Sequence, residues 1–238
     1  MNLLEYRNVA KYYGGLRAIE DMSFNVAQGE IVGLIGPNGA GKTTLFAMAS
    51  GFTPPTRGEI WFAGIRIDAA NAPAICRLGL CRTFQIVRPF GDMTVLENTM
   101  IGAFLRHSDR REAEHRALAV LERVGLASRE NQIARTLTLA GRKRLEVAKA
   151  LATQPRLLLL DEVMAGLTTV ETDEMIALIR DLRDGGLTVL LIEHNMHAVM
   201  SLSDRVVVLH HGHKIGDGLP SAIAGDPAVI AAYLGGGE

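Results

Sequence analysis

The chain has 238 residues, enough for one large domain or two small ones, and 48% of them are hydrophobic, which is ample for a core. Its 25 Lys and Arg residues nearly balance its 26 Asp and Glu residues, so no global charge favours nucleic acid or an anionic membrane as a partner. We expect no secretion signal, because the N-terminus lacks a basic segment followed by an apolar one. No apolar run approaches the roughly 20 residues that span a bilayer. The two cysteines favour a reducing cytosol over a disulfide framework.

The first thirty residues predict two strands. Residues 3–9 mix β-formers with polar residues, which favours an edge strand, and residues 11–15 predict a turn. A second strand is expected over 22–26. Tyr13 precedes the next motif and could stack on a nucleobase, with Tyr12 as the alternative and core packing as the ordinary role of either ring.

A glycine-rich loop follows a short apolar strand over 31–35 and precedes a helix over 45–50. Its residues are Gly36, Pro37, Asn38, Gly39, Ala40, Gly41, Lys42, Thr43 and Thr44. The glycines let consecutive N–H groups face an anion, and the helix N-terminus adds partial positive charge. Lys42 supplies a full charge for the β- and γ-phosphates, and the Thr43 hydroxyl can hold Mg²⁺. This context predicts binding of a nucleoside triphosphate.

The next segments predict two smaller units beside the nucleotide-binding core. A strand over 59–64 runs into a turn, so the N-terminal strands should form a small antiparallel sheet. Apolar residues then follow helical spacing over 93–104 and 113–124. We expect one domain, in which residues 1–89 and 136–238 form the core with its β subdomain and residues 90–135 form an inserted helical subdomain.

The helical subdomain carries no acid–base constellation, so we expect it to contact a partner. The segment 87–98 is the candidate, because Val87, Pro89, Phe90 and Met93 are apolar and follow Gln85 closely. Gln85 itself could contact a metal or a water molecule and report γ-phosphate occupancy to these helices.

From Arg144 onward, predicted helices alternate with strands that are apolar throughout. Such strands imply a sheet covered on both faces, and therefore a mostly parallel, doubly wound α/β fold. The helices are expected over 145–153, 172–184 and 197–203, and the strands over 157–160, 188–192 and 205–209.

Ligand chemistry in such sheets gathers at the carboxyl ends of the strands. Asp161 and Glu162 follow the strand over 157–160, so Asp161 is assigned to Mg²⁺ and Glu162 to the general base that activates water. His194 follows the strand over 188–192. An isolated histidine is usually structural, but at this place it could hydrogen-bond the γ-phosphate and the attacking water.

Taken together, these residues resemble the ATP-binding subunit of an ABC transporter, with the motifs in the same order along essentially the whole chain. The resemblance implies ATP hydrolysis, a dimer of two ATPase subunits that sandwich two ATP molecules, and integral membrane permease subunits. It places the chain at the cytoplasmic face of the plasma membrane, held there through the permease. A DNA-repair or translation ATPase would carry long coiled coils or a second nucleotide domain, so no nucleic-acid partner is expected.

Within that family the likeness is greatest to the ATPases of branched-chain amino acid importers, which implies a solute-binding protein as a further partner. An ATPase of lipid or lipopolysaccharide export is the alternative. The segments that carry this likeness are Arg82-Thr83-Phe84-Gln85, Met93-Thr94-Val95-Leu96-Glu97-Asn98, Ala165-Gly166-Leu167, Ile192-Glu193-His194-Asn195-Met196 and Ala232-Tyr233-Leu234-Gly235.

The signature segment departs from the family pattern Leu-Ser-Gly-Gly-Gln. Counting back from Asp161 places it on residues 137–141, so that the Thr138 hydroxyl could reach a γ-phosphate across the dimer and Ala140 stands at a usual glycine. A shift of one residue would instead put Gly141 at the position of close approach, and both registers remain open.

Two further positions depart from the family pattern. Thr168 stands at a usual aspartate, and Val163 at a usual proline. We expect ATP turnover to persist, at a rate that the departures at Ala140 and Thr168 could lower.

Overall fold

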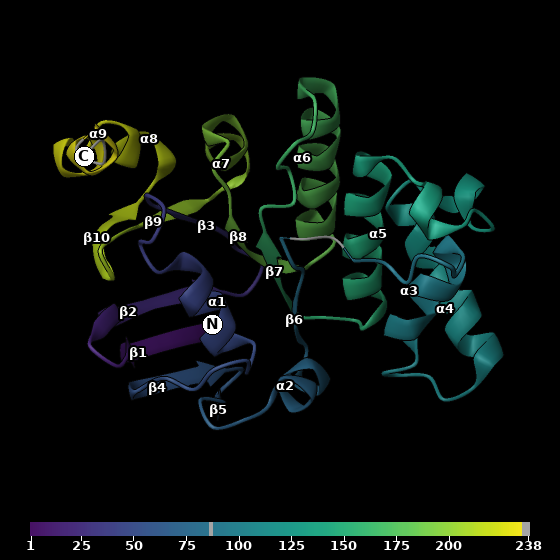
Figure 1. Ribbon diagram of the computed structural model, residues 1–238, viewed down its shortest axis with the longest axis horizontal. Coiled ribbons are helices and arrows are strands. Elements are labelled where there is room, and N and C mark those ends of the chain that lie inside the picture. Colours follow the sequence, from purple (N-terminus) through teal and green to yellow (C-terminus); the bar gives the residue numbers. More distant parts are fainter. Residues whose placement is uncertain (86–87, 235–238) are drawn as a thin grey trace.

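The computed structural model describes residues 1–85 and 88–234, so Val87 of the expected partner segment and Gly235 lie outside it. Within the described residues the strands form two sheets (Figure 1). The four-stranded sheet has the order β2 (Leu16–Ala27), β1 (Asn2–Tyr13), β4 (Arg57–Phe62) and β5 (Ile65–Arg66). The six-stranded sheet has the order β10 (His213–Gly218), β9 (Arg205–His210), β3 (Ile31–Ile35), β8 (Thr188–Ile192), β7 (Leu157–Asp161) and β6 (Leu80–Arg82).

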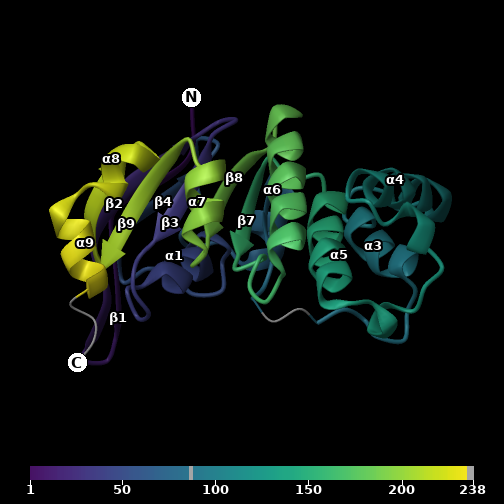
Figure 2. The same cartoon turned by 90° about the horizontal axis from the view of Figure 1, so that it is seen from above.

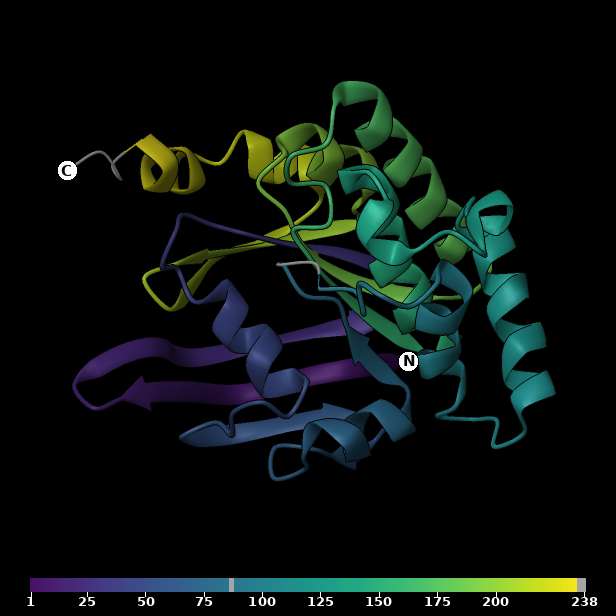
Figure 3. The ribbon, with the colours of Figure 1, turned by 45° about the vertical axis from the view of Figure 1, so that its right-hand side comes forward.

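Helix α1 (Lys42–Ala49) lies between the two sheets (Figure 3). Its Leu45 and Phe46 share one hydrophobic cluster with Tyr6 of β1 and with Leu34 of β3, and the Tyr6 hydroxyl donates to the Leu45 carbonyl at 3.0 Å. The phosphate loop is therefore supported from both sides by packed strands.

The six-stranded sheet is buried on both faces. Strands β3, β6, β7, β8 and β9 run parallel, and β10 pairs antiparallel with β9. Alternate residues of β8 belong to different clusters: Leu190 packs toward α1, and Leu191 packs toward the helices of the other face. This two-sided burial confirms the mostly parallel α/β fold and explains the uninterrupted apolar runs.

The other face of this sheet is covered by helices, and a helical unit extends the molecule at one end (Figure 2). Helix α5 stands between α6 and the pair α3 and α4, so it connects the core to that unit. The helices are α2 (Ala72–Leu78), α3 (Val95–Ala103), α4 (Arg110–Arg123), α5 (Leu139–Ala152), α6 (Thr169–Asp184), α7 (Met196–Leu202), α8 (Pro220–Ala224) and α9 (Pro227–Leu234), with short 3₁₀ turns at Ala127–Arg129 and Ala134–Thr136.

Several expected elements differ from the structure. The expectation of an edge strand over 3–9 is wrong, because β1 pairs with β2 on one side and β4 on the other. Its polar residues mark a solvent-facing side of the sheet, not an unpaired edge. The turn expected over 11–15 is shorter, since β1 continues to Tyr13.

Helices α1, α4, α5 and α6 begin three or more residues earlier than expected. Helix α1 starts at Lys42, directly after Gly41, and α5 starts at Leu139 because the Thr138 side chain caps it by accepting from the Gly141 N–H at 3.2 Å. None of the helices in the described part of the chain combines the length and apolar content that crossing a bilayer requires.

Candidate nucleotide-binding and catalytic site

The loop between β3 and α1 needs its glycines. Gly36 has φ +146° and Gly41 has φ +104°, both in the region that favours glycine. A Cβ on Gly36 would lie 2.1 Å from the Leu209 carbonyl oxygen, and one on Gly41 would lie 2.4 Å from the Ile19 side chain. The loop can follow this path only with bare backbone at these two positions, so the first N–H groups of α1 remain open to an anion.

Lys42 is folded against the loop that precedes it. Its side chain is buried, and Nζ donates to the carbonyl oxygens of Gly36 at 2.6 Å and Pro37 at 2.9 Å. Burial lowers the pKa of Lys42, while the carboxylates of Glu162 and Asp161 act against that shift. A triphosphate would offer this ammonium charged oxygens in place of neutral carbonyls.

The carboxyl ends of β7 and β8 bring the acidic pair and the histidine together. The parallel register sets Asp161 opposite Ile192, so the residues that follow these strands meet at one edge of the sheet. Glu162 Oε2 accepts from Gln85 Nε2 at 2.7 Å, and Glu162 Oε1 lies 3.0 Å from His194 Nε2. Gln85 and His194, which come from distant parts of the sequence, thus both contact the Glu162 carboxylate.

One cavity of about 500 Å³ joins most of these groups. Tyr13 lines it and is half exposed, whereas Tyr12 is not among the lining residues and its hydroxyl accepts from Arg57 instead. The first two loop residues, Gly36 and Pro37, are not among the lining residues. The lining residues include Tyr13, Asn38, Gly39, Ala40, Gly41, Lys42, Thr43, Thr44, Gln85, Glu162 and His194.

The residues expected to hold Mg²⁺ also share a cavity. Thr43, Gln85 and Asp161 line an adjacent cavity of about 770 Å³. They offer a hydroxyl, an amide oxygen and a carboxylate, and Mg²⁺ prefers such oxygen ligands and takes few from the protein when phosphates supply the rest. The donor set therefore fits this ion.

The signature residues lie apart from both cavities. Thr138 is exposed and Ala140 is partly exposed at the start of α5, but Gly141 is buried. A Cβ on Gly141 would lie 3.2 Å from Leu137 Cδ2, so this glycine faces inward. Within one chain these residues do not meet the phosphate loop.

Three charged residues at the site were not assigned from the sequence. Arg82 Nη2 donates to Asp161 Oδ2 at 2.7 Å, and both side chains are almost fully buried. Lys143 Nζ donates to the Glu162 carbonyl oxygen at 2.7 Å, and Glu193 Oε1 accepts from the Met164 N–H at 2.9 Å. Arg82 ends strand β6 and Glu193 directly follows strand β8, so their places at strand ends were an available signal. Nothing in the sequence separates Lys143 from its basic neighbours.

Glu193 predicts a pH dependence of stability. Burial raises the pKa of this carboxyl to about 7, while the Met164 N–H and the Lys143 charge act in the opposite direction. Between the ordinary glutamate value of 4.5 and about 7, the folded chain holds a proton that the unfolded chain has lost, so stability falls as the pH rises through this window.

Because Glu193→Gln cannot titrate, we expect wild-type stability to fall by about 3 kcal/mol relative to this variant between about pH 5 and about pH 8. Urea unfolding of both proteins across that range measures the difference. A difference that is independent of pH would contradict the expectation.

Comparison with known proteins agrees with this geometry. A family model described as ABC transporter matches residues 19–165, and one described as branched-chain amino acid ATP-binding cassette transporter matches residues 213–238. The high-affinity branched-chain amino acid transport ATP-binding protein BraF of Pseudomonas aeruginosa is 42% identical, over 98% of this chain and 98% of BraF. The lipopolysaccharide export system ATP-binding protein LptB of Escherichia coli K12 is 36% identical, over 99% and 98%.

Among solved structures, the ADP conformation of an ATP-binding cassette of an ABC transporter matches with a TM-score of 0.90 and 28% identity, over 99% of each chain. The resemblance drawn from the ordered motifs is confirmed by these matches. The chain therefore belongs to the ATP-binding cassette ATPases of ABC transporters, among the branched-chain amino acid transport ATP-binding proteins.

Proposed function

We propose that this chain is the ATP-hydrolysing motor subunit of an importer for branched-chain amino acids or similar small solutes. The observation that carries the proposal is the convergence of Gln85 and His194 on the Glu162 carboxylate, at the wall of a cavity that the phosphate loop also lines. The similarity to BraF supports the solute class.

In this proposal each group has one role. The loop N–H groups, the α1 N-terminus and Lys42 bind the phosphates, and Tyr13 stacks on the base. Glu162 accepts a proton from the attacking water, and His194 hydrogen-bonds the γ-phosphate and that water. Thr43, Asp161 and Gln85 would hold Mg²⁺, which when bound would neutralise charge on the phosphate oxygens.

The signature segment completes the site of a second subunit. Because Thr138 and Ala140 lie apart from their own phosphate loop, we propose that they face the ATP of the other chain in a head-to-tail dimer. The burial of Gly141 supports the ungapped register, with Ala140 at the position of close approach, since an inward-facing residue cannot meet a ligand.

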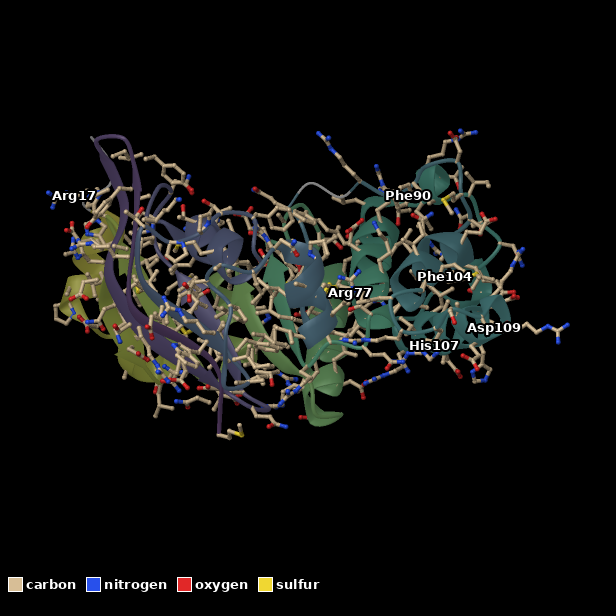
Figure 4. All side chains as sticks on the ribbon, turned by 90° about the horizontal axis from the view of Figure 1, so that it is seen from below. Arg17, Arg77, Phe90, Phe104, His107 and Asp109 are labelled. Atoms are coloured by element: carbon tan, nitrogen blue, oxygen red, sulfur yellow. The ribbon has the colours of Figure 1, made fainter. Side chains whose placement is uncertain are left out.

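We further propose that the permease binds the 770 Å³ cavity between the core and the helical subdomain, taken as residues 90–135. Phe90, Ile101 and Leu105 give it apolar walls, and Gln85 connects it to Glu162. Figure 4 shows Phe90 at the surface of this unit, and its side chain is 52% exposed. Through the permease, the chain would be held at the cytoplasmic face of the plasma membrane.

A negative charge at Phe90 and Met93 should disrupt assembly of the chain with the permease. We expect Phe90→Glu combined with Met93→Glu to abolish copurification with the permease, because a carboxylate cannot enter an apolar contact without a partner. Phe90 lines the cavity and Met93 lies in the expected partner segment 87–98. Phe104→Glu is the matched control, since Phe104 is exposed on the same unit (Figure 4) but lies outside both the cavity lining and that segment. Pull-down with the tagged permease measures the effect, and normal assembly of the double variant would exclude this surface.

Reconstitution tests the function as a whole. The chain, its permease and its solute-binding protein are combined in proteoliposomes, and ATP hydrolysis is measured with and without leucine. Stimulation by the leucine-loaded binding protein is expected. Copurification with a lipid-transport partner, without response to any amino acid, would instead favour the export alternative that LptB represents.

A further inference from the structure

The turn that follows β7 holds Glu162 in an unusual conformation. Glu162 has φ +51°, in the left-handed region where a side chain with a Cβ is disfavoured. Such a residue persists only where its surroundings hold it, and such positions cluster at functional sites. Its carboxylate is the one that Gln85 and His194 contact.

Three contacts hold the backbone of this turn. The Glu162 N–H donates to the Ile192 carbonyl at 2.9 Å, and the Glu162 carbonyl oxygen accepts from Lys143 Nζ at 2.7 Å. Two residues later, the Met164 N–H donates to Glu193 Oε1 at 2.9 Å. The turn is thus held from β8 on one side and from α5 on the other.

Lys143 and Glu193 are themselves buried, with 4% and 3% of their surface exposed. Burial lowers the pKa of Lys143, and the Glu193 carboxylate is foremost among the charges that act against this shift. Placing a lysine and a glutamate in the interior is unfavourable unless each is hydrogen-bonded. Both direct a polar atom at the backbone of the same turn, which is more than packing would require.

Helix α5 connects this turn to the segment 137–141. Lys143 lies on the second turn of α5, whose start carries Thr138 and Ala140. Leu139, the first residue of the helix, packs closely against Gly166, just beyond the turn. A displacement of α5 would therefore move the Glu162 carbonyl through the Lys143 ammonium.

We propose that Lys143 and Glu193 are positioning residues that clamp the Glu162–Met164 turn and aim the Glu162 carboxylate. This inference rests on the proposed role of Glu162 as general base. It adds that α5, which would meet the nucleotide of a second subunit at its N-terminus, aligns the general base of its own chain through Lys143. ATP bound at one site thereby controls the base at the other.

The test compares Lys143→Met with Lys143→Arg in the full-length protein. Methionine keeps the length of the stem but cannot donate to the Glu162 carbonyl, so we expect kcat to fall about 100-fold, the scale of a misplaced catalytic group. KM for ATP and the Kd for a fluorescent ATP analogue should stay within about threefold of wild type, because no ground-state contact with nucleotide is removed. Arginine can still donate to that carbonyl and should restore most of the turnover.

Glu193 offers a second pair of variants with the same logic. Glu193→Gln keeps an oxygen that accepts from the Met164 N–H, whereas Glu193→Met does not, so only the methionine variant should lose turnover. Lys214→Met is the surface control, since Lys214 pairs with Asp217 on β10. If Lys143→Met does not fold, the Glu193 pair decides alone.

The outcomes separate this inference from the proposed function. Wild-type kcat in Lys143→Met, or equal kcat in the two Glu193 variants, would overturn the clamp while leaving the general base in place. Loss of ATP binding together with turnover would also overturn it, because that pattern indicates a general structural role. If Glu162→Gln retained wild-type turnover, Glu162 would not be the general base, and the proposed function would be contradicted.

Discussion

Glu162→Gln is expected to lower the steady-state ATP turnover of the purified chain by about a thousandfold, the middle of the range that a positioned general base contributes. The amide cannot accept a proton from water, yet it is almost the same size and can still contact Gln85 and His194. ATP binding should therefore survive. Turnover is measured by phosphate release, and binding by equilibrium titration with a fluorescent ATP analogue.

The control for this variant is Glu122→Gln, which makes the same chemical change at an exposed position of α4. It should turn over ATP like the wild type. If Glu162→Gln did so as well, the assignment of the general base would be wrong. Accumulation of an ATP-bound dimer in Glu162→Gln alone, visible by size-exclusion chromatography, would support the head-to-tail arrangement in addition.

Lys42→Met is expected to weaken ATP binding by about 100-fold, because it removes a charge-assisted hydrogen bond to phosphate that is worth up to about 3 kcal/mol. The fold should survive the change. Burial lowers the pKa of Lys42, so the charged form of its ammonium is disfavoured at this position. Methionine fills a similar space without needing the carbonyl oxygens of Gly36 and Pro37 as partners.

Thermal unfolding separates binding from folding in this variant. At an ATP concentration 100 times the wild-type Kd, binding stabilises the wild type by about 2.7 kcal/mol, and Lys42→Met should lose most of that gain. Lys214→Met serves again as the surface control and should keep it. Equal stabilisation of Lys42→Met and wild type by ATP would contradict the role given to Lys42.

Local sequence pattern was sufficient to predict some elements of the structure. The strand, glycine loop and helix at 31–50 were predictable because their pattern is local: the glycines that adopt positive φ and the lysine proposed to bind phosphate follow one another in the chain. The apolar strands β7 and β8 were predictable within a residue, since two-sided burial leaves no polar positions in them.

Several short elements were missed. Helices α2, α8 and α9 and strand β10 were not expected, and α2 buries only Ile75. Their existence depends on capping and pairing with neighbours, as in the Asn71 side chain that accepts from the Ala74 N–H. The misplaced edge assignment for β1 has a related cause, because polar residues in a strand report an exposed face but not which neighbours pair with it.

By itself, the sequence determined the kind of chemistry: a phosphate loop, an acidic pair after one strand and a histidine after another, in an order typical of one family. Only the tertiary structure decided that Gln85, Glu162 and His194 meet, that Asp161 is paired with Arg82, and that Lys143 and Glu193 hold the turn at Glu162. The physical reason is that parallel strand order and helix packing set which distant residues become neighbours. A buried charge can be tolerated only where those neighbours satisfy it.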